Sequence, residues 1–419
     1  MFVLIVFMTL CCFVVGQGLN AGTSVYLSYR GETAALAGIG AAAFSAAAAM
    51  SRIVFGPLAD LRGRILVITL GSVVLLAGTA GAAVFTDLNL FVLWRVLQGT
   101  GFAAVTTAAA TAAADVLPAE RLGEGIGYYG LGQAIAMSIG PALAIFLVST
   151  DPAENLFRGL SVSAAAVFIV SFFCHYENNL DRLPETATYR RIAAGRAALD
   201  EVGQSEGKSA DAGDAGANDA PKGGLLHTIF EPKALAGALP IMVICPTFGF
   251  GIYFTGLLGT KLGIANAGLF YTVSAFAMIV VRLASRSFMD RTPAFRMHVV
   301  AAVVGVVFCA MLVAAEQASV AGGVRDMLFY LAGIPYGLCL GIAMPVNQAV
   351  SVKNSPPERW GAANGLYLLL TDVGIGTAAI VWGVTNDLLG FTATLGLVAL
   401  FIIASVLVAW LTYPASEKR

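Results

Sequence analysis

The stretch GPLADLRGR, residues 56–64, holds three charged side chains, two glycines and a proline. It lies between two apolar runs, 34–55 and 65–85. Each run is longer than the roughly 18 residues that a helix needs to cross a hydrocarbon core about 30 Å thick. The sequence therefore predicts two membrane-spanning helices that meet in a tight turn at the membrane surface.

The same pattern recurs along the whole chain. Of its 419 residues 58% are hydrophobic and only 12% are charged, against about 25% charged in an ordinary soluble domain. Lipid cannot hydrogen-bond the backbone, so each apolar run must satisfy its own peptide groups as a helix. We expect an all-α integral membrane protein. The twelve predicted spans are 2–27, 34–55, 65–85, 89–112, 122–148, 158–176, 234–258, 265–285, 296–315, 326–349, 360–384 and 389–413.

The first apolar run resembles a secretory signal in its position. It has no basic segment ahead of its apolar core, and eleven further spans follow it. We therefore interpret residues 2–27 as the first transmembrane helix. Since this helix begins directly after Met1, we expect that a few residues precede Met1 in the natural chain.

Lysines and arginines are distributed unevenly between the predicted loops. With both termini inside, nineteen fall on the cytoplasmic side and four on the outer side, while Arg95 lies within a span. Cytoplasmic loops of membrane proteins are enriched in these residues. The count predicts a multi-pass protein of the plasma membrane with both termini in the cytoplasm. We expect a monomer in the lipid bilayer, with no nucleic-acid partner.

The chain divides into two halves around residues 177–233. This segment contains SEGKSADAGDAGANDAPKGG (205–224), which is low in complexity and predicts a largely disordered cytoplasmic linker. Just before it, TYRRIAAGRAALDEV (188–202) predicts a basic surface helix. The expected domains are an N-terminal six-helix bundle at 1–176 and a C-terminal six-helix bundle at 234–419.

The two halves repeat each other. PAERLGEGIGYY (118–129) aligns with PPERWGAANGLY (356–367), and Arg52 precedes Asp60 by eight residues as Arg282 precedes Asp290. A repeat of six spans with matching loops predicts two pseudo-symmetric bundles around a central site, as in many secondary transporters.

Two segments resemble motifs of the major facilitator superfamily. GPLADLRGR (56–64) is similar to its motif A, and RVLQGTGFA (95–103) to its motif B. The residues of RVLQGTGFA that fit are Arg95, Gln98, Gly99 and Gly101.

The fifth span is a weaker match to motif C, the signature of drug:proton antiporters. Gly127, Gly140 and Pro141 fit that motif, and we expect them to let helices approach closely or bend, or to serve packing alone. Glycines of the motif are replaced by Ala136, Ala144 and Ile145. The chain thus resembles a transporter of this superfamily, most like the twelve-span drug:proton antiporters.

Motif A implies a charged latch at the cytoplasmic surface. Gly56 and Gly63 would permit the tight turn, while Asp60, Arg62 and Arg64 would supply the charges. The alternative is ordinary positive-inside charge.

The resemblance suggests that Asp115 or Glu124 supplies the partner carboxylate of this latch. In the second half Arg286 and Pro293 replace the expected glycines around Asp290. The sequence therefore predicts an asymmetric gate.

Two charged residues lie well within predicted spans, Arg95 and Asp372, while Arg52 and Arg282 are expected to snorkel to the cytoplasmic face. An ionised group at mid-bilayer costs roughly 2.5–3.5 kcal/mol on insertion scales, so such groups usually face a cavity. Arg95 stays protonated. It can hold an anionic substrate group, act on a facing carboxylate, or serve as a hydrogen-bond hub for packing.

Asp372 stands in the apolar stretch GLYLLLTDVGIG (365–376) and can exchange a proton. Burial favours the protonated form of a carboxyl group and a nearby cation favours the ionised form, so a rocking helix can load and unload a proton there. Asn364, eight residues earlier, is expected near the same face. The alternative is a neutral packing residue.

Other polar residues predict a central cavity. Gln17 and Asn20 are the polar groups of the first span, which has no carboxylate, and they are candidates for substrate binding together with Gln98. Tyr253 and its neighbours in the seventh span predict aromatic walls suited to amphipathic molecules. Further candidates are Phe248, Phe250, Thr255, Asn347 and Gln348.

Cofactor and enzyme functions find no support. The six cysteines have no CxxC spacing and the three histidines form no metal-binding pattern, so we expect no metal and no cofactor. GIGYYG (125–130) has no preceding strand and is not a dinucleotide site.

The leading hypothesis is a proton-coupled exporter of drug-like molecules or metabolites that works by alternating access, with a small molecule and protons as its partners. The alternative is an efflux permease for one defined metabolite, such as a sugar, nucleoside or metallophore. A third hypothesis is a non-transporting membrane sensor on the same fold.

Overall fold

The structure is a computed structural model that describes residues 1–118, 122–178, 183, 184, 187, 190, 231–288, 292–318, 323–356 and 360–418. Within these ranges the regular elements are all helical and no strand occurs. Most of the predicted linker, including nearly all of the predicted surface helix at 188–202, lies outside the described residues.

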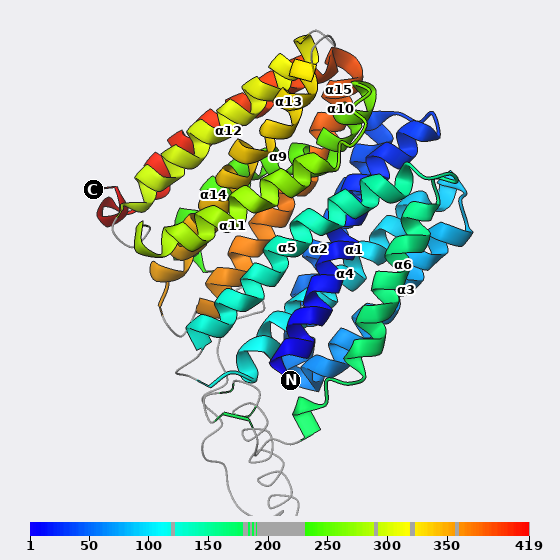
Figure 1. Cartoon of the computed structure of the whole chain (residues 1–419). Helices are drawn as coiled ribbons and strands as arrows, with labels where there is room; N and C mark the ends of the chain where they lie inside the picture. The colour runs from blue at the N-terminus through cyan, green and yellow to red at the C-terminus, as the bar shows by residue number, and fades with distance from the viewer. Residues whose placement is uncertain are drawn as a thin grey trace, which may run out of the picture.

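The N-terminal half contains one helix for each predicted span (Figure 1). These helices are α1 (Phe2–Tyr29), α2 (Ala34–Arg62), α3 (Arg64–Val84), α4 (Phe91–Asp115), α5 (Leu122–Val148) and α6 (Asn155–Ser171).

The C-terminal half covers its six predicted spans with seven helices. These are α9 (Leu235–Tyr253), α10 (Thr255–Lys261), α11 (Leu269–Phe288), α12 (Ala294–Gln317), α13 (Val324–Leu331), α14 (Gly333–Lys353) and α15 (Trp360–Thr412).

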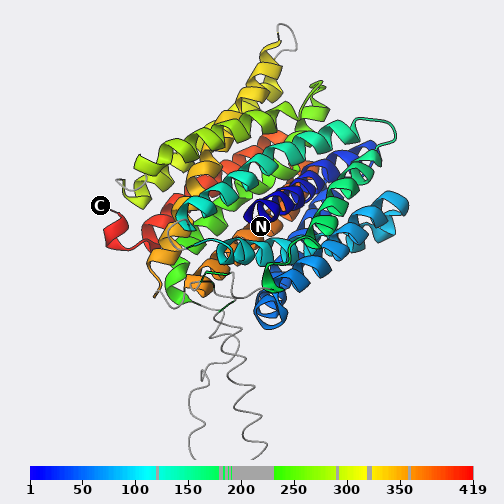
Figure 2. The same cartoon turned by 60° about the horizontal axis from the view of Figure 1, so that its bottom comes forward.

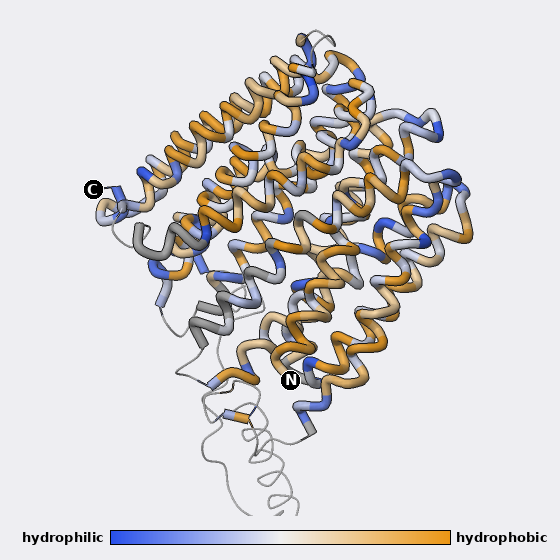
Figure 3. The backbone as a smooth tube through the Cα atoms, viewed as in Figure 1, coloured by the Kyte–Doolittle hydropathy of each residue, from blue (hydrophilic) through white to orange (hydrophobic). Residues whose placement is uncertain are grey.

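Nine stretches of the described helices are long and apolar enough to cross a membrane. The shorter apolar helices Asn155–Ser171 and Leu269–Arg282 bring the total to eleven. Because α15 covers two predicted spans, the count agrees with twelve. Figure 3 shows hydrophobic residues along the middle of the helices and most hydrophilic ones at the two ends of the bundle.

Helix α15 reverses direction at Gly390. This residue has φ 82° and ψ 175°, a backbone conformation outside the helical region that glycine adopts without strain. Leu366 and Thr412 lie on either side of it, yet Leu366 packs against Ala234 and the Thr412 hydroxyl bonds Ala236 O at 2.9 Å. Both ends of α15 therefore lie beside the start of α9.

One predicted boundary was wrong, and two predicted spans are interrupted. Residues 56–62 of the predicted loop continue α2 in helical form, with Pro57 inside the helix, and the chain turns only at Gly63. Predicted spans seven and ten are each interrupted by one residue, Phe254 and Ala332. At the first interruption the Tyr271 hydroxyl donates to Gly251 O and Ile252 O, which satisfies carbonyls that the broken helix leaves free.

The same pairs of helices pack together in both halves. In the N-terminal half α1 packs on α5, and both α2 and α3 pack on α4. In the C-terminal half α9 packs on α15, and both α11 and α12 pack on α14. Between the halves, α2 packs on α15, α5 on α11, and α1 on α9 and α10. Figure 2 brings the end with the N-terminus forward and shows α1 in the middle of the bundle. The fold is two pseudo-symmetric six-span bundles, as predicted.

Glycines of α4 permit its close packing in the N-terminal half. A Cβ on Gly99 would collide with the backbone carbonyl of Phe44 in α2, and one on Gly101 with the backbone of Leu75 in α3. These glycines are part of the resemblance to motif B, and their place in the structure gives that resemblance a steric reason.

We predict that Gly99→Ala lowers the free energy of unfolding by about 1–3 kcal/mol, because the backbone of α2 must shift to make room. The control is Gly396→Ala, at an exposed helical position with open space around it. This variant should be neutral or slightly more stable. Thermal unfolding of the purified protein in detergent measures both, and equal midpoints would contradict the steric argument.

Candidate functional site

The interface between α2 and α15 runs along both helices in antiparallel register. From one end inward, Gly383 lies against the backbone of Ala34, Gly38 against that of Ala379, and Gly376 against Ser45. Small residues let the two backbones approach closely where the halves meet. We call this interface the α2–α15 seam.

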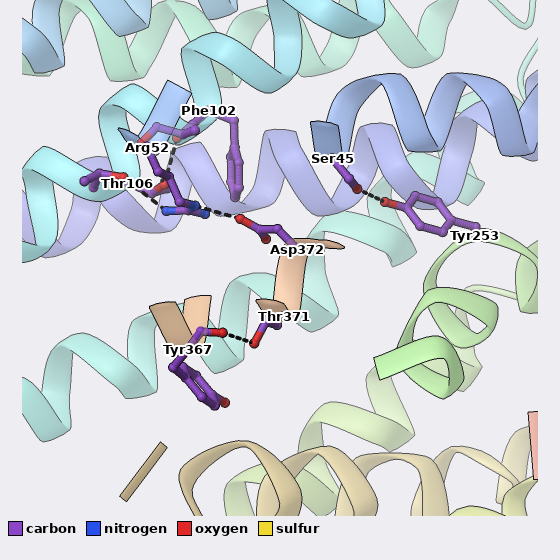
Figure 4. A network of polar contacts seen from close by, with 10 residues as sticks. Ser45, Arg52, Phe102, Thr106, Tyr253, Tyr367, Thr371 and Asp372 are labelled. Atoms are coloured by element: carbon purple, nitrogen blue, oxygen red, sulfur yellow. Dashed lines mark hydrogen bonds and ion pairs between the residues drawn. The ribbon is translucent and has the colours of Figure 1, made fainter. Parts of the chain in front are cut away.

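An ion pair between the halves follows next along the seam. Arg52 Nε of α2 donates to Asp372 Oδ2 of α15 at 2.8 Å (Figure 4). Arg52 Nη1 also donates to Thr107 Oγ1 of α4 at 3.1 Å. The side chains of Arg52 and Asp372 are 17% and 21% exposed. The sequence identified Asp372 but assigned Arg52 to the membrane surface. Its partner lies 320 positions away in the chain, which local patterns do not show.

Beyond this ion pair the close glycine contacts of the seam end. In the same register Gly56 of α2 would stand opposite Gly365 of α15, and each has open space where a Cβ would lie. These two glycines belong to the end of the bundle that holds Gly63 and the N-terminus.

Arg95 is the centre of a fully buried cluster in the N-terminal half. Its guanidinium donates to Asn20 Oδ1 at 2.7 Å, Gln98 Oε1 at 3.1 Å and Gly40 O at 3.1 Å. It also lies 4.7 Å from the ring centroid of Phe44, a cation–π contact. The structure thus brings together the predicted residues Arg95, Gln98 and Asn20, and each of these four contacts joins the guanidinium to a neutral group.

Tyr253 reaches from the C-terminal half toward this cluster. Its hydroxyl lies 3.3 Å from Ser45 Oγ of α2 (Figure 4), and its backbone carbonyl accepts a hydrogen bond from Ser24 of α1. Tyr253 and the other aromatic candidates, Phe248 and Phe250, are all buried, and Phe250 packs on the rings of Phe254 and Phe391.

Gln17 lines a small cavity between the two halves. The space left there is about 10 Å³, roughly enough for one water molecule. Its polar lining comes from Gln17, Tyr271, Ser274 and Tyr336. The remaining lining residues are Met137, Pro141, Ile252, Ala275, Met278 and Leu340.

The hydrogen-bond partner of Asn364 belongs to α14. It accepts a hydrogen bond of 2.7 Å from Gln348 of α14. Asn347, the neighbour of Gln348, also points into the C-terminal half, where Tyr413 donates to its Oδ1 at 2.8 Å and His298 Nδ1 lies 3.1 Å from its Nδ2. His298 is fully buried, which the sequence did not reveal.

The turn of motif A contains a second ion pair. Gly63 has φ 102° and joins α2 to α3. Arg64 Nε lies 3.0 Å from Asp115 Oδ2 at the end of α4, and the two side chains are 1% and 2% exposed. Arg62 is exposed. The side chains of Asp60 and Glu124 lie outside the described ones, so the choice between Asp115 and Glu124 as the partner carboxylate stays a prediction.

Glu177, which the sequence did not single out, caps the start of α3. One oxygen of its carboxylate accepts hydrogen bonds from Arg64 N at 2.6 Å and Ile65 N at 3.2 Å. Burial raises the pKa of the Glu177 carboxyl above its usual 4.5, although these two N–H groups act in the opposite direction. A carboxylate at a helix N-terminus is favourable, but no sequence pattern indicates that it comes from the short 3-10 helix Tyr176–Asn178, which follows α6.

The motif of α5 serves a close approach of two helices. A Cβ on Gly140 would lie 2.7 Å from Val14 O and 3.1 Å from Gly18 N of α1. Pro141 follows inside the same helix. Gly127 also lies in α5, but its surroundings are outside the described part of the structure.

Comparisons with known proteins agree with this architecture. The sequence profile of the Major Facilitator Superfamily matches residues 5–338, so the chain belongs to this superfamily of membrane transporters. Among solved structures, the nucleoside transporter NupG superposes with a TM-score of 0.67 at 16% identity, covering 98% of each chain. A D-xylose–proton symporter gives 0.70 at 14% identity, covering 99% of this chain and 98% of the other. These structures support the fold alone.

Relatives in sequence include efflux proteins. The Staphylopine export protein of Staphylococcus aureus is 22% identical over 331 residues, 79% of this chain and 75% of that protein. Multidrug resistance protein 3 of Bacillus subtilis is 24% identical over 128 residues, 30% of this chain and 25% of that protein. The chain is therefore a multi-pass membrane transporter and not an enzyme, with efflux proteins among its relatives.

We predict that Asp115→Ala lowers the free energy of unfolding by about 3 kcal/mol, because it leaves the Arg64 charge buried without this carboxylate. Arg62→Ala, which removes an exposed charge two residues earlier, is the control and should change little. Chemical denaturation in detergent measures the free energy of unfolding of both variants. Equal stability would show that the Arg64–Asp115 pair does not stabilise the fold.

We also predict that Glu177→Ala costs about 1 kcal/mol through loss of the α3 cap, while Glu177→Gln, which keeps an acceptor, costs less. The pKa of Glu177 is raised in the fold, so the stability that this shift contributes is complete when the pH is below the usual pKa of a glutamate. That stability is lost as the pH rises through the pKa of Glu177 in the folded state. Wild type should therefore lose stability relative to Glu177→Gln across that range. A difference in stability between wild type and Glu177→Gln that does not change with pH would contradict the raised pKa of Glu177.

Proposed function

We propose that this protein exports small molecules in exchange for protons by alternating access, with Asp372 as the proton carrier. The observation that supports this most directly is the Arg52–Asp372 ion pair across the α2–α15 seam. Membership of the superfamily supports transport, and the efflux relatives support its outward direction.

A proton on Asp372 would change the contact between the halves. The ionised carboxylate pairs with Arg52 at 2.8 Å and holds α2 to α15. Uptake of a proton by Asp372 removes its negative charge, while the guanidinium keeps its positive charge. The attraction between the helices is then lost, and the halves are free to rock apart along the seam. Asp372 is 21% exposed at the point where the close glycine contacts of the seam end, so a proton can reach it.

The substrate would bind between the two halves. Gln17, Tyr271, Ser274 and Tyr336 offer a few polar groups among apolar and sulfur-containing side chains. Such a surface suits a small amphipathic molecule. The cavity is nearly filled in this state, so binding requires the halves to separate.

The second candidate is an exporter of one defined metabolite. The relative that matches 79% of this chain is named for the export of a single compound, whereas the multidrug relative matches only 30%. Both candidates share proton coupling and differ in the range of compounds transported.

The remaining features form part of the same proposal. The positive-inside distribution supports a plasma-membrane protein with both termini in the cytoplasm. In that orientation the end of the α2–α15 seam at Gly56 and Gly365 faces the cytoplasm. The Arg64–Asp115 pair would belong to the latch of motif A, and the protein would act as a monomer.

The test uses proteoliposomes with an acidic interior and records the collapse of the pH gradient when dyes, drugs or metabolites are added. We predict that at least one compound discharges the gradient through wild type, and that Asp372→Asn reduces this rate by an order of magnitude or more. Asp151→Asn, at an exposed carboxylate in the loop between α5 and α6, is the control and should behave as wild type. Discharge at the wild-type rate by Asp372→Asn would contradict the proposal.

A neutral pair separates coupling from structure. The double variant Arg52→Gln with Asp372→Asn keeps side chains of similar size that can hydrogen-bond between the same helices, but neither side chain exchanges a proton. It should fold as wild type does and remain unable to couple transport to protons. Recovery of proton-driven transport in this variant would mean that the pair is only structural. Discharge by many unrelated compounds would favour the drug exporter, and discharge by one metabolite the second candidate.

A further inference from the structure

A second carboxylate of α15 contacts the N-terminal half at the closed end of the seam. Asp387 Oδ1 accepts a hydrogen bond from Ala34 N at 3.1 Å, and Asp387 Oδ2 accepts one from Ala35 N at 2.7 Å. These are the first two residues of α2. Asp387 lies 15 residues after Asp372, about 22 Å along an α-helix.

The cap of α2 is shared between the two halves. The first four N–H groups of a helix have no partner within it. In α2 the Thr33 side chain accepts from Leu36 N at 3.2 Å, and Thr33 O accepts from Ala37 N at 3.4 Å. The other two N–H groups depend on Asp387. An anion there also interacts favourably with the positive end of the helix dipole.

Among the described residues, no carboxylate makes this contact on the pseudo-symmetric seam between α5 and α11. Continued without gaps, the alignment of residues 118–129 with 356–367 matches Asp387 with Ser149. The Ser149 hydroxyl donates to Phe146 O of its own helix at 2.7 Å. The carboxylate cap is therefore a feature of the α2–α15 seam and does not follow from the repeat.

We propose that Asp387 is the latch that keeps this end of the transport pathway closed. The inference rests on the alternating-access cycle proposed above. To open this end, α15 must withdraw from α2, which breaks both hydrogen bonds and separates the carboxylate from the helix N-terminus. The latch thus stabilises the state in which the opposite end, at Gly56 and Gly365, is open. Asp372 would respond to protons where the seam parts, and Asp387 would set how readily the other end opens.

The test measures the accessibility of one cysteine at the latch. Ala34→Cys is introduced in a background without the six native cysteines, at a position that is 7% exposed in the closed seam. The purified protein in lipid nanodiscs is labelled with a hydrophilic maleimide, which reaches both ends of the bundle. This measurement requires neither substrate nor a pH gradient, so it can fail or succeed independently of proton-coupled export.

Asp387→Ala should raise the labelling rate roughly fivefold, within the range expected for the loss of a helix cap. Asp387→Asn keeps an acceptor but loses the charge, and it should give a smaller increase. Asp151→Asn, at an exposed carboxylate in the loop between α5 and α6, should label as the parent does.

Equal labelling rates in the parent and both Asp387 variants would overturn the proposal. Each variant is first shown to be folded by a cooperative thermal unfolding transition. If Asp387→Ala does not fold, Asp387→Asn decides alone, and parent-like labelling by that variant overturns the latch.

Discussion

The hydrocarbon core offers no hydrogen-bond partner, and the structure depends on how the protein satisfies its buried cations internally. Three arginines illustrate three solutions. Arg95 is surrounded by neutral acceptors and the Phe44 ring, Arg64 meets a carboxylate of its own half, and Arg52 meets a carboxylate of the other half. The helices must stay in register for these contacts to persist.

These solutions differ in which parts of the molecule they join. The contacts of Arg95 and Arg64 link helices of the N-terminal half, so they support a bundle that moves as one body. The Arg52–Asp372 contact joins the two halves and is only partly buried. Permanent contacts within a half and exchangeable contacts between halves are what a rocking transporter requires.

Close packing gives the α2–α15 seam its sharp boundaries. Gly38, Gly376 and Gly383 allow the backbones to touch along the closed part, where a side chain at any of them would push the halves apart. The polar contacts lie at the limits of this packed region, with Asp387 at one end and Asp372 at the other. Charge and packing together define where the seam opens.

The sequence by itself determined the number of spans, the six-plus-six repeat and the residues whose charge or polarity is costly in a membrane, because apolar length and charge are local properties. It singled out Asp372, Arg95 and, as alternatives, Asp115 or Glu124, but it did not reveal that Arg52 is the partner of Asp372. Nor did it single out Asp387 or Glu177. Only the tertiary structure decided these contacts, since each joins residues more than 100 positions apart. Their geometry depends on helix register and interhelical distance, which the order of apolar and polar residues does not encode.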